Sequence, residues 1–205
     1  MTCRKGGFIS IRHNELADEW SDLCSKAFKS HNVRDEPLIH SGRGPVMTQT
    51  ASGTTEALPE TRGDVAVTGF FERGVTTIFD ITISDTDCPT YRGQDPAKVL
   101  AGREKAKKSK HLQACLAQRR TFTPLAFSVD GLRGSEANAA CKQLAAKLAA
   151  RWKRPYSHLC GYVRSRLSLA LVRSASLCLR GERNPLARRT RPSCDDGAEL
   201  SAYFH

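Results

Sequence analysis

The 205-residue sequence contains eight cysteines, but no two of them are spaced as CxxC. Structural zinc sites are usually built on such pairs, so we expect no zinc site complete within this chain. The sequence also lacks an uncharged apolar run of about 18 residues, the length that a membrane-spanning helix needs. No signal peptide opens the chain. We therefore expect no membrane partner and an intracellular location, nuclear or cytoplasmic, in which the cysteines stay reduced.

Acidic residues are scarce relative to basic ones: 21 Asp and Glu stand against 32 Lys and Arg, for a net charge of +11. The excess is clustered, because residues 98–120 hold eight basic residues and one Glu, and residues 151–191 hold eleven and one. Clustered positive charge of this kind favours a polyanionic partner, most often nucleic acid. We therefore expect nucleic acid as the partner.

Apolar periodicity predicts seven elements in the order α-β-β-α-β-α-α. The first two strands form a hairpin around residues 72–74, and the next helix is rich in lysine. Such an order is satisfied by an α/β (or α+β) fold, in which a small mixed sheet is flanked by helices. The predicted ranges are 11–29 (helix), 64–71 and 76–83 (strands), 97–119 (helix), 122–129 (strand), and 135–152 and 157–180 (helices).

Two segments have the composition of irregular chain. Residues 30–62 are rich in Gly, Ser, Thr and Pro, which predicts a mobile loop. Residues 182–205 are dominated at their start by Arg, Pro and Gly, which predicts a disordered basic tail. The main domain is therefore expected to span residues 11–181.

The chemistry is expected at two aspartates, Asp64 and Asp80, each at an end of a strand-like run. A carboxylate beside apolar strand residues costs desolvation energy, and two on neighbouring strands repel each other. A divalent cation such as Mg²⁺ or Mn²⁺ between them relieves both costs. Glu15 on the first helix could add a third ligand, and a lysine from the 97–119 helix could stabilise a phosphodiester transition state.

Each candidate has a simpler interpretation. Asp64 follows a glycine and could be a turn residue, whereas Asp is depleted in strand settings such as that of Asp80. Asp85 and Asp87 precede a proline, so a turn is favoured over metal binding. His13 could be a base or a capping residue. Cys24, Cys88 and Cys115 could be nucleophiles only with a nearby base, which the sequence does not supply.

A set of short motifs resembles the C-terminal part of non-LTR retrotransposon (reverse transcriptase) polyproteins. The motifs are Cys3-Arg-Lys-Gly-Gly-Phe, Arg12-His-Asn-Glu-Leu, Gly69-Phe-Phe-Glu-Arg-Gly, Phe79-Asp-Ile, Arg103-Glu-Lys-Ala-Lys-Lys, Phe122-Thr-Pro-Leu, Arg164-Ser-Arg-Leu-Ser-Leu-Ala-Leu-Val-Arg and Cys178-Leu-Arg-Gly. The resemblance covers roughly residues 3–183. It implies a restriction-enzyme-like endonuclease of the PD-(D/E)XK type that nicks target DNA. Residues 1–10 would be the remnant of an upstream zinc-knuckle junction, and the reverse transcriptase is absent.

Carried over by position, the resemblance makes Asp64 and Asp80 the two acidic catalytic residues. Lys105 or Lys108 would be a displaced catalytic lysine, because Thr82 fills the strand position of that lysine, and His111 stands where the family often has Tyr. Retroelement RNA becomes a second candidate partner. The basic residues expected to contact phosphates are Lys98, Arg103, Lys107, Lys110, Arg166, Arg173 and Arg180.

Three functions remain open from the sequence. The first is the metal-dependent endonuclease. The second is a catalytically dead retroelement remnant that binds nucleic acid through its basic surface. The third is a small structural or regulatory protein, which would have no acidic pocket. Convergence of Asp64, Asp80 and a lysine in space would distinguish the first from the others.

Overall fold

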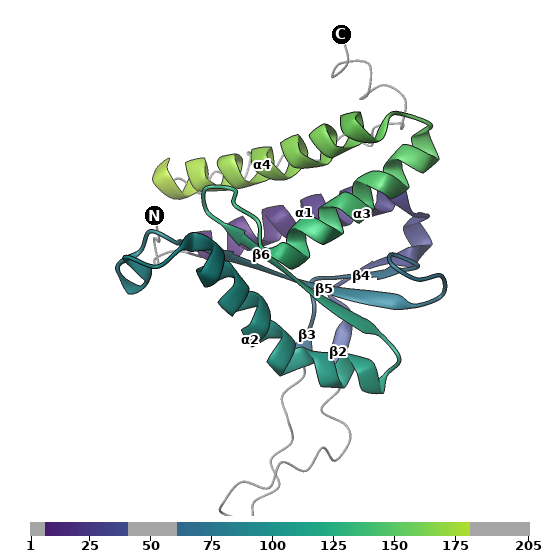
Figure 1. The fold of residues 1–205 in the computed structure, drawn as a ribbon, viewed down its shortest axis with the longest axis horizontal. Helices are drawn as coiled ribbons and strands as arrows, with labels where there is room; N and C mark the ends of the chain where they lie inside the picture. The colour runs from purple at the N-terminus through teal and green to yellow at the C-terminus, as the bar shows by residue number, and fades with distance from the viewer. Residues whose placement is uncertain (1–6, 41–60, 181–205) are drawn as a thin grey trace, which may run out of the picture.

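The computed structural model describes residues 7–40 and 61–180. Helices cover both faces of a small mixed sheet (Figure 1), as the sequence predicts. The four-stranded sheet has the order β1-β4-β5-β6, and a separate two-stranded ribbon pairs β2 with β3. The strands are β1 (Val33–Asp35), β2 (Leu38–His40), β3 (Thr61–Arg62), β4 (Val65–Thr68), β5 (Thr76–Ser84) and β6 (Thr121–Ser128).

The order of strands follows from their connections. β4 and β5 pair antiparallel, and the turn between them contains Gly69 and Gly74, whose φ angles of 85° and 80° suit glycine. β5 and β6 pair in parallel, so the chain needs a crossover between them. Helix α2 (Pro96–Ala117) supplies it, and an Asp95 side chain that accepts from the Ala97 amide caps its start.

Helices α1 (Phe8–Ala27) and α3 (Ser135–Trp152) cover one face of the sheet, and α4 (Tyr156–Arg180) packs outside them (Figure 1). This face holds the main apolar core. Trp20 of α1 is fully buried, with its ring centroid 5.3 Å from that of Phe79 on β5. The Phe70 ring, just after β4, lies 4.7 Å from Phe79, so aromatic rings fix α1 against the hairpin.

Helix α2 covers the opposite face. A smaller apolar cluster lies there, composed of Ile39, Ala66, Ile78, Cys115 and Phe122. Because side chains alternate along a strand, Asp80 of β5 faces this side together with Ile78, while Phe79 and Ile81 face the main core. The α2 face is therefore where the polar residues of β5 gather.

The seven elements expected from the sequence are all present, with ends that differ by a few residues. The interpretation of residues 30–62 as a loop throughout is wrong, because β1, β2 and β3 lie within it. These strands have two or three residues each, too few for an alternating pattern to show in the sequence. The part at 41–60 and the expected tail at 182–205 lie outside the described residues.

The helix predicted over 11–29 begins earlier in the structure, because α1 starts at Phe8, which is buried. Residues 1–6 of the expected zinc-knuckle junction lie outside the described residues. Within the described segments, no helix combines the length and the apolar character that crossing a membrane requires.

Candidate functional site

Asp80 lies in the middle of β5, 5% exposed, beneath α2. Its Oδ1 accepts a hydrogen bond from Lys107 Nζ at 3.0 Å, and the same Nζ lies 2.9 Å from Oδ2. His111 Nε2, one helical turn further along α2, is 3.8 Å from Oδ2. The strand and the helix thus bring a carboxylate, an ammonium and an imidazole together.

Asp64 lies directly before β4 and beside Asp80. Val65 opposes Phe79 in the β4–β5 ladder, so residues 64 and 80 come next along it. The Asp64 amide donates to the Phe79 carbonyl at 2.9 Å, and its Oδ2 accepts from the Ile81 amide. Beyond Phe79, β5 pairs only with β6 among the described strands, so β4 has no carbonyl opposite the Ile81 amide. The Asp64 carboxylate accepts the hydrogen bond of that amide instead.

His13 of α1 completes this edge. Its Nε2 lies 3.1 Å from the Ile81 carbonyl oxygen and 3.2 Å from Asp64 Oδ2. The hydrogen bond with Asp64 raises the pKa of His13 above its ordinary value, although burial opposes this. His13 is therefore neither a helix cap nor a core residue, and it lies in direct contact with one of the two predicted acidic residues.

The surroundings of Asp80 raise the pKa of its carboxyl group. Burial raises the pKa of Asp80, Lys107 acts in the opposite direction, and the charge of Asp64 raises that pKa further. Asp80 Oδ2 is buried and has no hydrogen bond of suitable geometry from any described residue. Its contact with Lys107 is therefore an ion pair without a well-aligned hydrogen bond. Among the described residues, the Lys107 ammonium is therefore the cation that balances this buried oxygen, although no donor is well aligned with it.

His111 is held as a neutral ring. Burial, and then the charges of Lys110 and Lys107, lower its pKa below the ordinary value. Its ring centroid is 5.4 Å from that of Phe122 on β6, so the imidazole packs on an aromatic neighbour. A neutral imidazole can donate or accept near Asp80 without adding a positive charge.

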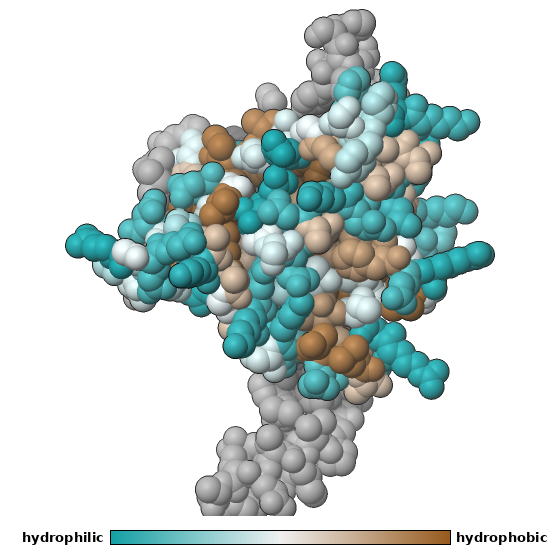
Figure 2. Space-filling view, in the orientation of Figure 1, coloured by the Kyte–Doolittle hydropathy of each residue, from teal (hydrophilic) through white to brown (hydrophobic). Residues whose placement is uncertain are grey.

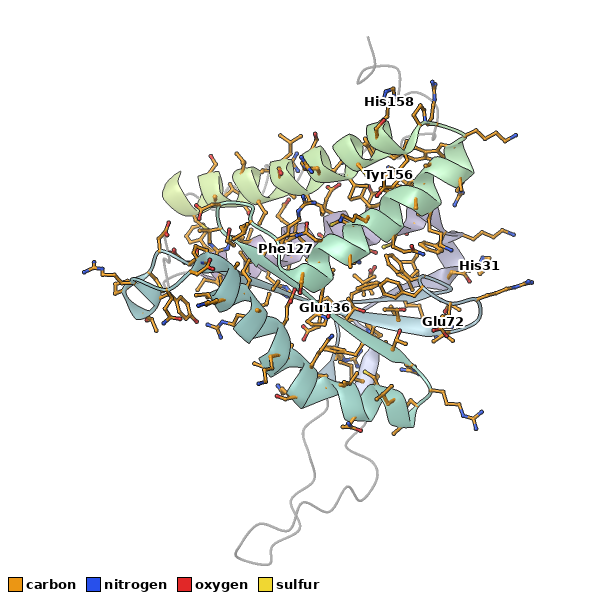
Figure 3. All side chains as sticks on the ribbon, viewed as in Figure 1. His31, Glu72, Phe127, Glu136, Tyr156 and His158 are labelled. Atoms are coloured by element: carbon orange, nitrogen blue, oxygen red, sulfur yellow. The ribbon has the colours of Figure 1, made fainter. Side chains whose placement is uncertain are left out.

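The lysine that reaches Asp80 is Lys107, which the sequence analysis assigned to phosphate contacts. Lys105 is exposed, and Lys108 instead pairs with Glu136 of α3, Nζ to Oε1 at 2.5 Å (Figure 3 labels Glu136). The expectation that Lys105 or Lys108 approaches the carboxylates is therefore corrected: Lys107 is the lysine that contacts Asp80. Helical spacing could have identified Lys107, because Leu100, Glu104, Lys107, His111 and Cys115 recur every three or four residues.

Glu15, the expected third metal ligand, does not contact the two aspartates. Its Oε2 lies 3.7 Å from Arg173 Nη1 of α4. The expectation that Glu15 is a third ligand beside Asp64 and Asp80 is therefore corrected. Across residues 7–40 and 61–180, no group of three His, Cys, Asp or Glu side chains is arranged to hold a metal. Mg²⁺ is often bound through only one or two carboxylates and several waters, and Asp64 with Asp80 fits that pattern.

The other candidate side chains have structural roles. Asp85 Oδ1 accepts from the Asp87 amide at 3.2 Å, as the turn interpretation expects. Burial raises the pKa of Cys115 to about 11 and that of Cys24 well above its ordinary value. Cys24 and Cys115 are therefore protonated thiols at neutral pH and not nucleophiles. Cys88, which is partly buried, has a free thiol.

The expected phosphate contacts divide into two groups. Lys98 and Lys110 are exposed on α2, and Arg103 is exposed but donates to the Tyr91 hydroxyl and covers its ring. Figure 2 shows hydrophilic side chains interspersed with apolar patches on the face of the molecule that α2 crosses. Lys98 and Lys110 are therefore solvent-accessible basic side chains.

The expected arginine stripe on α4 is not a single exposed surface. Arg166 is 14% exposed and pairs with Glu19, Nε to Oε1 at 2.7 Å, and with Asp22, Nη2 to Oδ2 at 2.9 Å. Arg166 thus joins α4 to α1, and its guanidinium is engaged by acidic side chains rather than exposed for a phosphate contact. Arg173 is 63% exposed. The side chain of Arg180 lies outside the described part of the structure.

One structural contact near the site was missed from the sequence. Glu104, 4% exposed, accepts from Ser135 Oγ at 2.9 Å and from the Glu136 amide at 3.0 Å, which caps the start of α3. A Cβ at Gly134 would overlap the Glu104 carboxylate, so a larger residue there would have to displace that carboxylate. Glu104 thereby fixes the position of α2 and of Lys107, three residues further on.

In comparisons with known proteins, no family model and no curated protein matched this chain.

Proposed function

We propose that this protein is a metal-dependent endonuclease that hydrolyses phosphodiester bonds of DNA. The observation that carries the proposal is the buried Asp80 carboxylate, whose Oδ2 has no donor of suitable geometry among the described residues, beside Asp64 and Lys107. The resemblance to the endonuclease region of retrotransposon polyproteins supports the same chemistry. The helix-flanked mixed sheet is the kind of fold that the resemblance implies.

Asp64 and Asp80 would hold Mg²⁺ or Mn²⁺. The bound ion would polarise the scissile phosphate and lower the pKa of an attacking water. Lys107 is 33% exposed, so its ammonium group would stabilise negative charge that develops on the phosphate while the lysine remains near Asp80. His13 holds Asp64 at the sheet edge, and Lys98 and Lys110 on α2 attract the DNA backbone.

The second candidate function is a non-catalytic nucleic-acid-binding protein. The observation that favours it is the ion pair itself, because Lys107 already neutralises Asp80 without a metal. Thr82, which stands where the family has its strand lysine, gives no substitute charge on β5. In this case the basic surface would bind DNA and the carboxylates would be structural.

Nicking of supercoiled plasmid separates the two functions. With Mg²⁺ or Mn²⁺ the full chain should nick slowly, and Asp80→Asn should lower the rate by about a hundredfold or more while binding is retained. Asp130→Asn, a change of the same kind at an exposed turn residue, is the matched control and should nick normally. Equal nicking by the wild type and Asp80→Asn would point to a contaminating nuclease, and binding without nicking would select the second function.

A further inference from the structure

A hollow of about 200 Å³ lies away from the Asp80 site, between α4 and the turn that follows β6. Arg164, Leu167, Ser168 and Leu171 of α4 line one side at spacings of three and four residues, so one face of the helix forms this wall. Phe127 of β6 (labelled in Figure 3) and Arg133 of the turn form the other side.

Arg133 and Arg164 are the charged groups of this hollow. Between residues 7–40 and 61–180, no acidic side chain pairs with either of them, in contrast with Arg166 two residues away, which has two acidic partners. Arg133 is partly buried; burial raises the pKa of the Cys141 thiol, and the charge and side-chain hydrogen bond of Arg133 lower it to a smaller extent. The Arg133 side chain is thus held in place, while Arg164 is exposed.

Arg133 and Arg164 line the same hollow, so both positive charges would attract an anion bound there. The walls of Phe127, Leu167 and Leu171 are buried and apolar, which strengthens such an attraction. Arginine matches phosphate geometry with two parallel N–H donors, and the Ser168 hydroxyl can donate a third hydrogen bond. The hollow is smaller than the roughly 300–1,000 Å³ of pockets for drug-sized ligands.

We propose that this hollow binds a phosphate group, through Arg133 and Arg164, with Ser168 as an additional donor. The phosphate can be a free ion or part of a nucleic acid, since both present the same oxygens. The proposal does not rest on the endonuclease function, because neither arginine contacts Asp64, Asp80 or Lys107. A failure to nick DNA would therefore leave it standing.

Titration of the isotopically labelled full chain with inorganic phosphate, at constant ionic strength against chloride, tests the proposal by NMR. Amide signals of residues 131–134 and 164–168 should shift together and saturate. Arg164→Ala and Arg133→Ala should each weaken binding about tenfold or more, because a hydrogen bond to a charged group is lost. Arg154→Ala removes the same charge from an exposed site between α3 and α4 and should leave the affinity unchanged.

Arg164→Lys keeps the charge but removes the two-pronged donor, so an affinity between those of wild type and Arg164→Ala is expected. Because Arg164 is exposed, its variants should unfold at the wild-type temperature, which keeps the test interpretable even if Arg133→Ala is unstable. Wild-type affinity in Arg164→Ala, or saturation absent in the wild type, would overturn the proposal.

Two single strands of one sequence, with and without a 5′-phosphate, identify the source of the phosphate. A preference for the phosphorylated strand that Arg164→Ala abolishes assigns the hollow to a strand end. Equal binding of both strands, displaced by inorganic phosphate in the wild type only, assigns it to a backbone phosphate. Displacement of neither strand, with inorganic phosphate still bound, assigns it to the free ion.

Discussion

The two faces of the sheet are built differently, although both use the same strand. On the side of α1 and α3, β5 presents Phe79 and Ile81 to a core of aromatic and aliphatic side chains. On the side of α2, the same strand presents Ile78 and then Asp80, whose carboxylate is buried with one oxygen lacking a well-aligned donor. The first face is packed mainly by apolar side chains, whereas the second holds the buried Asp80 on which the proposed function depends.

The main core should respond most strongly to substitution. Phe79→Ala removes a fully buried ring that contacts Trp20 and Phe70, so it should lower the free energy of unfolding by about 3–5 kcal/mol. Urea denaturation of both proteins measures this. Phe71→Ala, at a ring that is 40% exposed, should cost less than about 1 kcal/mol. Equal losses at the two positions would mean that the hairpin packs differently.

The α2 face should respond in activity rather than in stability. Lys107→Ala should slow plasmid nicking by about a hundredfold, because the only described lysine in contact with Asp80 is lost. Lys105→Ala, two residues earlier on the same helix and exposed, should nick within about twofold of the wild type. The reverse ranking would restore the assignment made from the sequence resemblance and would contradict the geometry.

The buried carboxylate should make the protein less stable as the pH rises. The folded pKa of Asp80 is raised by burial, so its favourable contribution is complete below the unfolded pKa, near pH 4, and is lost as the pH rises through the folded value. Asp80→Asn cannot ionise. The unfolding free energy of the wild type, measured in urea from pH 4 to 7, should therefore fall relative to that of Asp80→Asn.

The opposite pH trend would show that Lys107 outweighs burial and that Asp80 is a stabilising ion pair. In that case both faces of the sheet, the α1–α3 face and the α2 face, would stabilise the fold, and the non-catalytic function would be favoured.

The surface of α2 should have the smallest effect per residue. If Lys98 and Lys110 contact phosphates, each alanine variant should reduce the salt slope of DNA binding by about 0.9. Fluorescence anisotropy between roughly 50 and 200 mM salt measures the slope. Arg154→Ala, beyond α3, should leave the slope unchanged. A uniform decrease for all three variants would mean that binding follows net charge alone.

The sequence predicted the large elements because their periodicity is long. Residues 135–152 and 122–129 match α3 and β6 within a residue at each end. Asp80 could be singled out because an aspartate among Ile78, Phe79 and Ile81 contradicts local strand preference. The short strands β1 to β3 could not be predicted, since each is stabilised by pairing with chain that is distant in sequence.

The expected positions of the catalytic lysine (Lys105 or Lys108) and of the third metal ligand (Glu15) were wrong for a different reason. Several lysines follow one another on α2, and only tertiary contacts decide which of them faces β5. Glu104 fixes the rotation of α2 about its axis, because it caps the start of α3 through residues about 30 positions later in the chain. Glu15 likewise turns toward Arg173 because α4, and not the hairpin, packs beside it. The fold was thus more predictable than the site.

Manganese titration of the labelled full chain, followed by paramagnetic broadening of its amide signals, tests the proposed metal site most directly. The amides of His13, Asp64, Asp80 and Ile81 should broaden first, Mg²⁺ should reverse the broadening, and Asp80→Asn should require far more Mn²⁺. Broadening that begins elsewhere, for example at residues 85–87, or that is the same in Asp80→Asn, would contradict a cation held between Asp64 and Asp80.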